Sequence, residues 1–264
     1  MMNGFITATQ FLTRLRVRDD AGVTAEGLAS SMKYFPLVGA IQGSLLAAAY
    51  YVLPYLFTPG VVAALLLFLL VLTNGGLHLD GFADTVDGLA GGSTPEYRLR
   101  IMRDSSTGAI GAVFLVLLLI LKYSAIKDLP NETGYRILIL FPAAGRWAIV
   151  PMSYWSPYAR PEGGVGRAFR ADTLTLLTAT LIVSVVTAML LGPWALTAIA
   201  LLGAVTYLFT GFFRKRLGGV TGDVFGFQSE VAEVVFLLAA PAVLRLCACE
   251  VPFTSVFTEV IGWI

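Results

Sequence analysis

Three aspartates recur at helical spacing in the stretch GGLHLDGFADTVDGLAGG, residues 75 to 92. Asp80, Asp84 and Asp87 are separated by four and three positions, so a helix through this stretch would carry them on one stripe. Carboxylates this close repel one another, and a divalent cation relieves the repulsion. Mg²⁺ prefers such hard oxygen ligands, usually one or two carboxylates together with water and substrate phosphate. The spacing therefore predicts a magnesium site, with Asp104 as a further candidate ligand.

A second acidic cluster, formed by Asp223, Glu230 and Glu233, overlaps the glycine-rich stretch LGGVTGDVFGFQ. Asp223 and Glu230 are seven positions apart, as Asp80 and Asp87 are. We predict that Asp223 joins the metal site, and that Gly219 and Gly222 leave room for substrate phosphate.

The candidates for proton transfer are His78, Asp87 and Glu230, with Asp223 as an alternative to Glu230. A general base must reach the proton that it removes, and the sequence does not give that distance. His78 is the only histidine in the chain and lies two positions before Asp80. Its alternative role is structural, as a residue that holds an aspartate in place.

Arginines and glycines near the aspartates indicate phosphate binding. Arg98 and Arg103 can each grip phosphate oxygens through two N–H groups, although both could equally serve as topogenic charge in a loop. Gly108 precedes the next apolar segment, where the free N–H groups of a helix start bind anions. Together these groups indicate phosphoryl chemistry on a diphosphate. The chain has no GxxxxGK[ST] motif, which argues against an ordinary nucleotide hydrolase.

The elements that must position these residues are membrane helices. Of the 264 residues, 57% are hydrophobic and 13% are charged, whereas soluble domains carry about 25% charged residues. The uncharged runs approach the roughly 20 residues that cross a bilayer as a helix. We predict an all-α bundle that forms one integral membrane domain over residues 1–264. The candidate spans are residues 34–57, 61–79, 109–126, 135–154, 174–191, 194–212 and 231–249.

Residues 1–33 are predicted to form an interfacial segment, because apolar residues recur there at helical spacing before a run of arginines. Residues 250–264 are too short to span and are predicted to be a variable tail. Gly39 and Gly43 form a GxxxG motif, which either lets two helices approach closely or reflects chance.

Basic residues are distributed unevenly over the loops that seven spans would create. Thirteen fall on the side of the N-terminus and three, Lys122, Lys127 and Arg136, on the other. Because basic residues mark the cytoplasmic side, we expect a cytoplasmic N-terminus. Both acidic clusters then lie at the cytoplasmic surface.

The two acidic segments resemble the signatures of a known family. HLDGFADTVDGLAGG, followed by RLRIMRDSSTGAIGAV, is similar to the first signature of the cobalamin synthase family, adenosylcobinamide-GDP ribazoletransferase. LGGVTGDVFGFQSEVAEVVFLL resembles the second signature. FLTRL, YFPLVGAIQG and YARPEGGVGRAF also resemble the family pattern, so the similarity extends over nearly the whole chain.

The resemblance implies an enzyme of the cell inner membrane that uses Mg²⁺. Its substrates would be adenosylcobinamide-GDP and α-ribazole, or α-ribazole 5′-phosphate, and its products adenosylcobalamin, or its 5′-phosphate, and GMP. No nucleic-acid partner is implied, and a homo-oligomer remains an open possibility.

Three other classes fit the residues less well. CDP-alcohol phosphotransferases carry D-x₂-D-G-x₂-A-R, whereas this chain reads D-G-x-A-D-x₂-D-G and lacks the arginine. Prenyltransferases need adjacent aspartates, which are missing here. A cation-coupled transporter would place acidic residues within its spans rather than at their ends on one face.

Overall fold

A computed structural model describes residues 2–16, 24–104, 106–160 and 165–248 of the protein. These residues form helices, and an isolated bridge joins Tyr158 to Val220. The α-helices are α1 (Met2–Leu12), α2 (Ala25–Ser31), α3 (Phe35–Val52), α4 (Pro59–Asn74), α5 (Leu77–Gly91), α6 (Pro95–Ile101), α7 (Ala109–Lys127), α8 (Gly134–Trp155), α9 (Thr173–Leu191), α10 (Leu196–Leu217) and α11 (Gly222–Ala248). Short 3-10 helices are η1 (Met32–Tyr34), η2 (Leu53–Tyr55), η3 (Val165–Ala168) and η4 (Pro193–Ala195). The all-α prediction is confirmed.

Six segments in the described part of the chain are long and apolar enough to cross a membrane. They are Ala25–Tyr55, Ala109–Lys127, Gly134–Trp155, Thr173–Leu191, Pro193–Leu217 and Gly222–Leu246. Together α4 and α5 could form a seventh, bent span, so the prediction of about seven agrees with the structure. Large apolar side chains stay exposed on α7 and α9, among them Phe114, Leu117 and Leu181, as expected for helices that face lipid.

Helix α8 lies at the centre of the bundle, and nearly all of its residues are buried. Gly39 and Gly43 bring α3 against it. A Cβ atom at Gly39 would lie 2.5 Å from the carbonyl oxygen of Pro142, and one at Gly43 would lie 2.3 Å from that of Ile139. The GxxxG motif therefore does mediate close helix packing.

The predicted second span, residues 61–79, is wrong as a single straight helix. Helix α4 ends at Asn74, and α5 leaves it at an angle of 92°. Gly75 and Gly76 make the turn with φ of 68° and 76°, a backbone region that side chains other than glycine rarely adopt. The Asn74 side chain accepts a hydrogen bond from the Gly76 N–H at 2.8 Å. The aspartate stripe therefore lies on a helix of its own.

Two further boundaries differ from expectation. Helix α11 begins at Gly222 rather than at residue 231, so its acidic residues lie inside the helix. Lys122 was assigned to a loop on the far side, but it lies inside α7 and is buried. Both differences have one cause: Lys122 of α7 pairs with Glu230 and Glu233 of α11 inside the bundle. A search for uncharged runs excludes such charged residues from the helices, although their pairing lets them be buried. The predicted tail, residues 250–264, lies outside the described residues.

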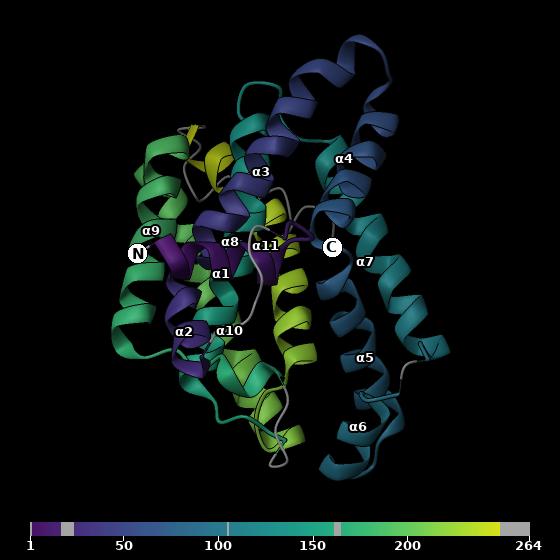
Figure 1. The fold of residues 1–264 in the computed structure, drawn as a ribbon. Helices are drawn as coiled ribbons and strands as arrows, with labels where there is room; N and C mark the ends of the chain where they lie inside the picture. Colours follow the sequence, from purple (N-terminus) through teal and green to yellow (C-terminus); the bar gives the residue numbers. More distant parts are fainter. Residues whose placement is uncertain (1, 17–23, 105, 161–164, 249–264) are drawn as a thin grey trace, which may run out of the picture.

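Figure 1 shows α11 between two groups of helices, with α8 on one side and α5 on the other. The loops that precede α7, α9 and α11 meet at one end of the bundle. Arg98 donates to the carbonyl oxygen of Arg216 at 3.0 Å, and the Ala159 N–H donates to that of Val220 at 2.8 Å. The segments that carry the candidate chemistry are thus gathered at a single end.

Candidate active site

The centre of the candidate site is the contact between α5 and α11. A Cβ atom at Gly81 would lie 2.8 Å from the carbonyl oxygen of Asp223, and one at Gly226 would lie 3.0 Å from that of His78. Two glycines that face each other therefore let the backbones approach closely. This approach places Asp223 beside the first turns of α5, which carry Asp80.

Four carboxylates share one electrostatic environment there. The charge on Asp84 interacts with those of Asp80, Asp87 and Asp223. Asp80 is exposed, while the other three side chains are partly buried. Like charges crowded at the edge of an apolar bundle favour the binding of cations.

Arg160 is a cation that the structure places among these acids. Its Nη2 lies 2.7 Å from Oδ2 of Asp223, and it also interacts with Asp84. The Val220 N–H donates to the carbonyl oxygen of Pro157 at 2.9 Å, which fixes the loop that carries Arg160. A Cβ at Gly219 would lie 2.4 Å from that same oxygen, so Gly219 permits this loop contact.

Asp87 differs from the other aspartates because α7 occupies both of its oxygens. Oδ2 accepts from the Gly108 N–H and Oδ1 from the Gly111 N–H, each at 2.8 Å. A carboxylate is stabilised at a helix N-terminus by these free N–H groups and by the helix dipole. The N–H of Gly108, which we expected to bind substrate phosphate, thus contacts the protein itself.

The other predicted phosphate and metal residues lie toward the rim. Arg98 is bound to the end of α10, as described above, and Arg103 is exposed. Asp104 is also exposed, and its Oδ1 accepts from the hydroxyl and the N–H of Ser106 at 2.7 and 3.0 Å. These hydrogen bonds lower the pKa of the Asp104 carboxyl. Among the described contacts, none joins Asp104 to the four-carboxylate cluster.

Glu230 and Glu233 lie apart from that cluster, in a buried group of charges. Lys122 pairs with both glutamates, and Arg146 lies 2.7 Å from Glu233. Each of these four side chains is at most 2% exposed. Because seven residues of helix extend about 10 Å, Glu230 lies two turns deeper than Asp223. The structure therefore does not bring Glu230, a candidate base, to the four carboxylates.

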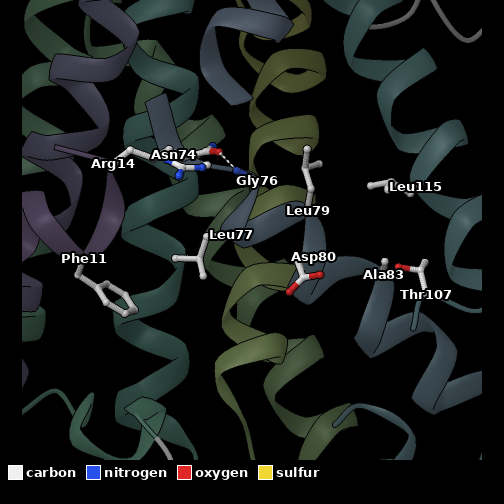
Figure 2. A pocket seen from close by; sticks show the side chains of 11 residues that line it. Phe11, Arg14, Asn74, Gly76, Leu77, Leu79, Asp80, Ala83, Thr107 and Leu115 are labelled. Carbon is white, nitrogen blue, oxygen red and sulfur yellow. Dashed lines mark hydrogen bonds between the residues drawn. The ribbon is translucent and has the colours of Figure 1, made fainter. Parts of the chain in front are cut away.

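Two cavities meet at Asp80. The smaller has a volume of about 280 Å³ and is lined by residues that include His78, Asp80, Gly222 and Asp223. The larger measures about 610 Å³ and includes Arg14, Asn74 and Thr107. Figure 2 shows this larger cavity, with Asp80 between Leu77 and Ala83. His78 is 2% exposed, and its Nδ1 has no hydrogen-bond partner among the described residues.

The donor set fits Mg²⁺ bound largely through substrate. No group of three or more His, Cys, Asp or Glu side chains in the described ranges forms a preassembled metal cluster. Mg²⁺ does not need one, since it commonly takes one or two carboxylates and completes its shell with water and phosphate. Asp80, Asp84 and Asp223 supply hard oxygen ligands beside a cavity, and no cysteine or histidine pair offers a zinc site there.

Sequence reasoning missed Arg160 as a site residue, because it was counted only among the basic residues of a loop. The available signal was its position in YARPEGGVGRAF, one of the segments with family resemblance. Phe11, Phe35 and Phe169 also line the smaller cavity, and nothing in their spacing indicated that they would meet.

The fold and this site define an all-α membrane protein with an acidic cavity at one end of its bundle. The model of the cobalamin-5-phosphate synthase family matches residues 4–241, and the chain belongs to that family. It is 40% identical to the adenosylcobinamide-GDP ribazoletransferase of Syntrophobacter fumaroxidans, over 91% of this chain and 98% of that protein.

Two more relatives carry the same name. The protein of Desulfitobacterium hafniense is 37% identical over 88% of this chain and 94% of its own length. The protein of Geotalea daltonii is 36% identical over 92% and 98%. No solved structure matches the chain.

Proposed function

We propose that the protein is an adenosylcobinamide-GDP ribazoletransferase of the cell inner membrane, which catalyses the cobalamin synthase step. The names of its relatives and the family match support this activity. The observation that carries the chemistry is the glycine contact between α5 and α11, which places Asp223 beside Asp80 and Asp84. The match over residues 4–241 favours this reaction over that of a CDP-alcohol phosphotransferase.

The reaction joins two substrates at phosphorus. The 3′-hydroxyl oxygen of α-ribazole, or of its 5′-phosphate, forms a bond to the phosphorus on the cobinamide side of the diphosphate. The bond from that phosphorus to the bridging oxygen breaks, and GMP leaves with this oxygen. The hydroxyl proton passes to a base, for which His78 and the carboxylates around Asp80 are the candidates nearest the cavities.

Asp80, Asp84 and Asp223 would hold Mg²⁺, which when bound neutralises the diphosphate and the departing phosphate. Arg160 pairs with Asp223 and is placed to orient phosphate oxygens. The uneven distribution of basic residues supports a cytoplasmic location for this end of the bundle.

The test is turnover by the purified protein in detergent, followed as GMP release and formation of the cobalamin product. Asp84→Asn and Asp223→Asn should each lower kcat about 100-fold or more, a loss typical when a charged group at a reacting centre is removed. Asp128→Asn, an exposed aspartate at the other end of α7, is the matched control and should turn over normally. EDTA should abolish turnover, and added Mg²⁺ should restore it.

Full activity in both site variants would refute the assignment of the site. Absence of GMP release by the unmodified protein would refute the assignment of the activity.

A further inference from the structure

The smaller cavity has an aromatic wall. Phe11 of α1, Phe35 of α3, Phe169 after η3 and Phe225 of α11 all line it. The rings of Phe11 and Phe169 lie 4.2 Å apart, and each lies 5.9 Å from the ring of Phe35. Four segments that are distant in the chain thus converge to form one apolar face.

Three polar side chains also belong to the lining. The carboxylates of Asp80 and Asp223 belong to it, as does His78, whose imidazole is 2% exposed with Nδ1 unpartnered in the described structure. A buried polar atom without a partner is costly, and the residue that carries it belongs to the lining of the cavity. The lining therefore suits a ligand with a flat apolar ring, a nitrogen or hydroxyl that bonds to histidine, and a part that reaches the carboxylates.

The size of the cavity distinguishes between the two substrates. At about 280 Å³ it lies just below the range of small-molecule sites, which measure about 300–1,000 Å³. A corrinoid that carries GDP is far larger than this. The larger cavity lies on the other side of Asp80 and shares Phe11 and Leu77 with the smaller one, so two ligands would meet at the carboxylates.

We propose that the smaller cavity binds the bicyclic aromatic base of the acceptor nucleoside, with His78 as its hydrogen-bond partner. The base packs against Phe11, Phe35 and Phe169, and the ribose points toward Asp80 and Asp223. This assignment rests on the proposed function, to which it adds a separate site for the acceptor.

Gly222→Leu tests the assignment by filling the cavity. Gly222 is exposed and lines the cavity, and a Cβ atom there would meet nothing within 4 Å, so a leucine fits at this edge of the cavity without a clash. We expect the KM for α-ribazole to rise about tenfold or more, and to rise more than the KM for adenosylcobinamide-GDP, whose phosphate was also predicted to lie near Gly222. Gly211→Leu on α10 is the matched control, because a Cβ there also meets nothing; both constants should stay unchanged.

Binding without turnover provides the second measurement. In equilibrium dialysis, α-ribazole should bind the unmodified protein and Gly211→Leu, and bind at least tenfold more weakly to Gly222→Leu. Free benzimidazole should compete with α-ribazole but not with adenosylcobinamide-GDP.

The inference is overturned if Gly222→Leu binds α-ribazole normally, if the corrinoid KM rises instead, or if the unmodified protein does not bind α-ribazole. These results differ from failure of the proposed function, in which α-ribazole binds but no GMP is released.

Discussion

At the scale of single residues, the aspartates of one stripe have different tasks. Asp84 is surrounded by other carboxylates and interacts with Arg160, whereas Asp87 accepts two hydrogen bonds from the start of α7. Equal spacing along a helix therefore does not imply equal chemistry. The difference is set by what each side chain faces.

Thermal denaturation should separate these tasks. Asp87→Asn loses a charge and an acceptor at a helix N-terminus, so it should destabilise the protein by about 1 kcal/mol as well as reduce turnover. Asp84→Asn relieves repulsion, so its melting temperature should be unchanged or higher although turnover is lost. Loss of turnover in Asp87→Asn with an unchanged melting temperature would show that Asp87 acts on substrate directly and not through α7.

At the scale of elements, buried charges hold three helices together. Lys122 of α7 and Arg146 of α8 contact Glu230 and Glu233 of α11. Arg146 also donates to Ser229 at 2.6 Å. Two positive and two negative charges make the group neutral, which is the condition for keeping ionised side chains away from water. These contacts set the position of α7 relative to α11. They therefore also influence Asp87 of α5, which accepts hydrogen bonds from the start of α7.

Removing one charge of this group should therefore lower the folding stability more than removing two opposite charges together. Lys122→Met leaves an uncompensated buried carboxylate and should cost about 3–5 kcal/mol of folding stability. The double variant Lys122→Met/Glu230→Gln is neutral again and should recover most of the melting temperature in detergent. Because Glu230 lies outside the acidic cavity, this double variant should also retain turnover. A stable but inactive double variant would instead make Glu230 a catalytic residue.

At the scale of the whole molecule, the bend between α4 and α5 decides whether the start of α3 lies at the same end as the loops before α7, α9 and α11. If α4 and α5 crossed the bundle separately, the start of α3 would lie at the opposite end from these loops, because α7 with α8 and α9 with α10 each cross and return. Instead, the ring of Phe35 at the start of α3 lies 5.9 Å from that of Phe169 in the loop before α9, so α3 starts at the end where these loops lie. The bent pair therefore acts as a single traverse of the bundle (Figure 1).

This arrangement predicts the membrane topology. An alkaline phosphatase fused to the C-terminus should be active, because an odd number of traverses ends outside the cytoplasm when the N-terminus lies inside. The same reporter fused after Arg216 should be inactive. Activity of the Arg216 fusion together with inactivity of the C-terminal fusion would invert the orientation and place the acidic cavity outside.

The sequence by itself determined the class of fold, the family and the presence of an acidic stripe. Each of these depends on neighbours within one segment: apolar runs long enough for a bilayer, aspartates at helical spacing, and signatures that are contiguous in the chain. A close helix contact at Gly39 and Gly43 was one of the two interpretations that the sequence allowed, but that α8 is the partner came only from the structure.

Only the tertiary structure decided which charged side chains form ion pairs with one another. Lys122 and Glu230 are 108 positions apart, and Arg160 and Asp223 are 63 apart, so no local pattern links them. The turn at Gly75 and Gly76 was likewise hidden, because glycine is compatible with both a helix and a turn. Spacing shows which side chains share a helix face, but the free energy of a buried charge depends on its partner, and packing selects that partner.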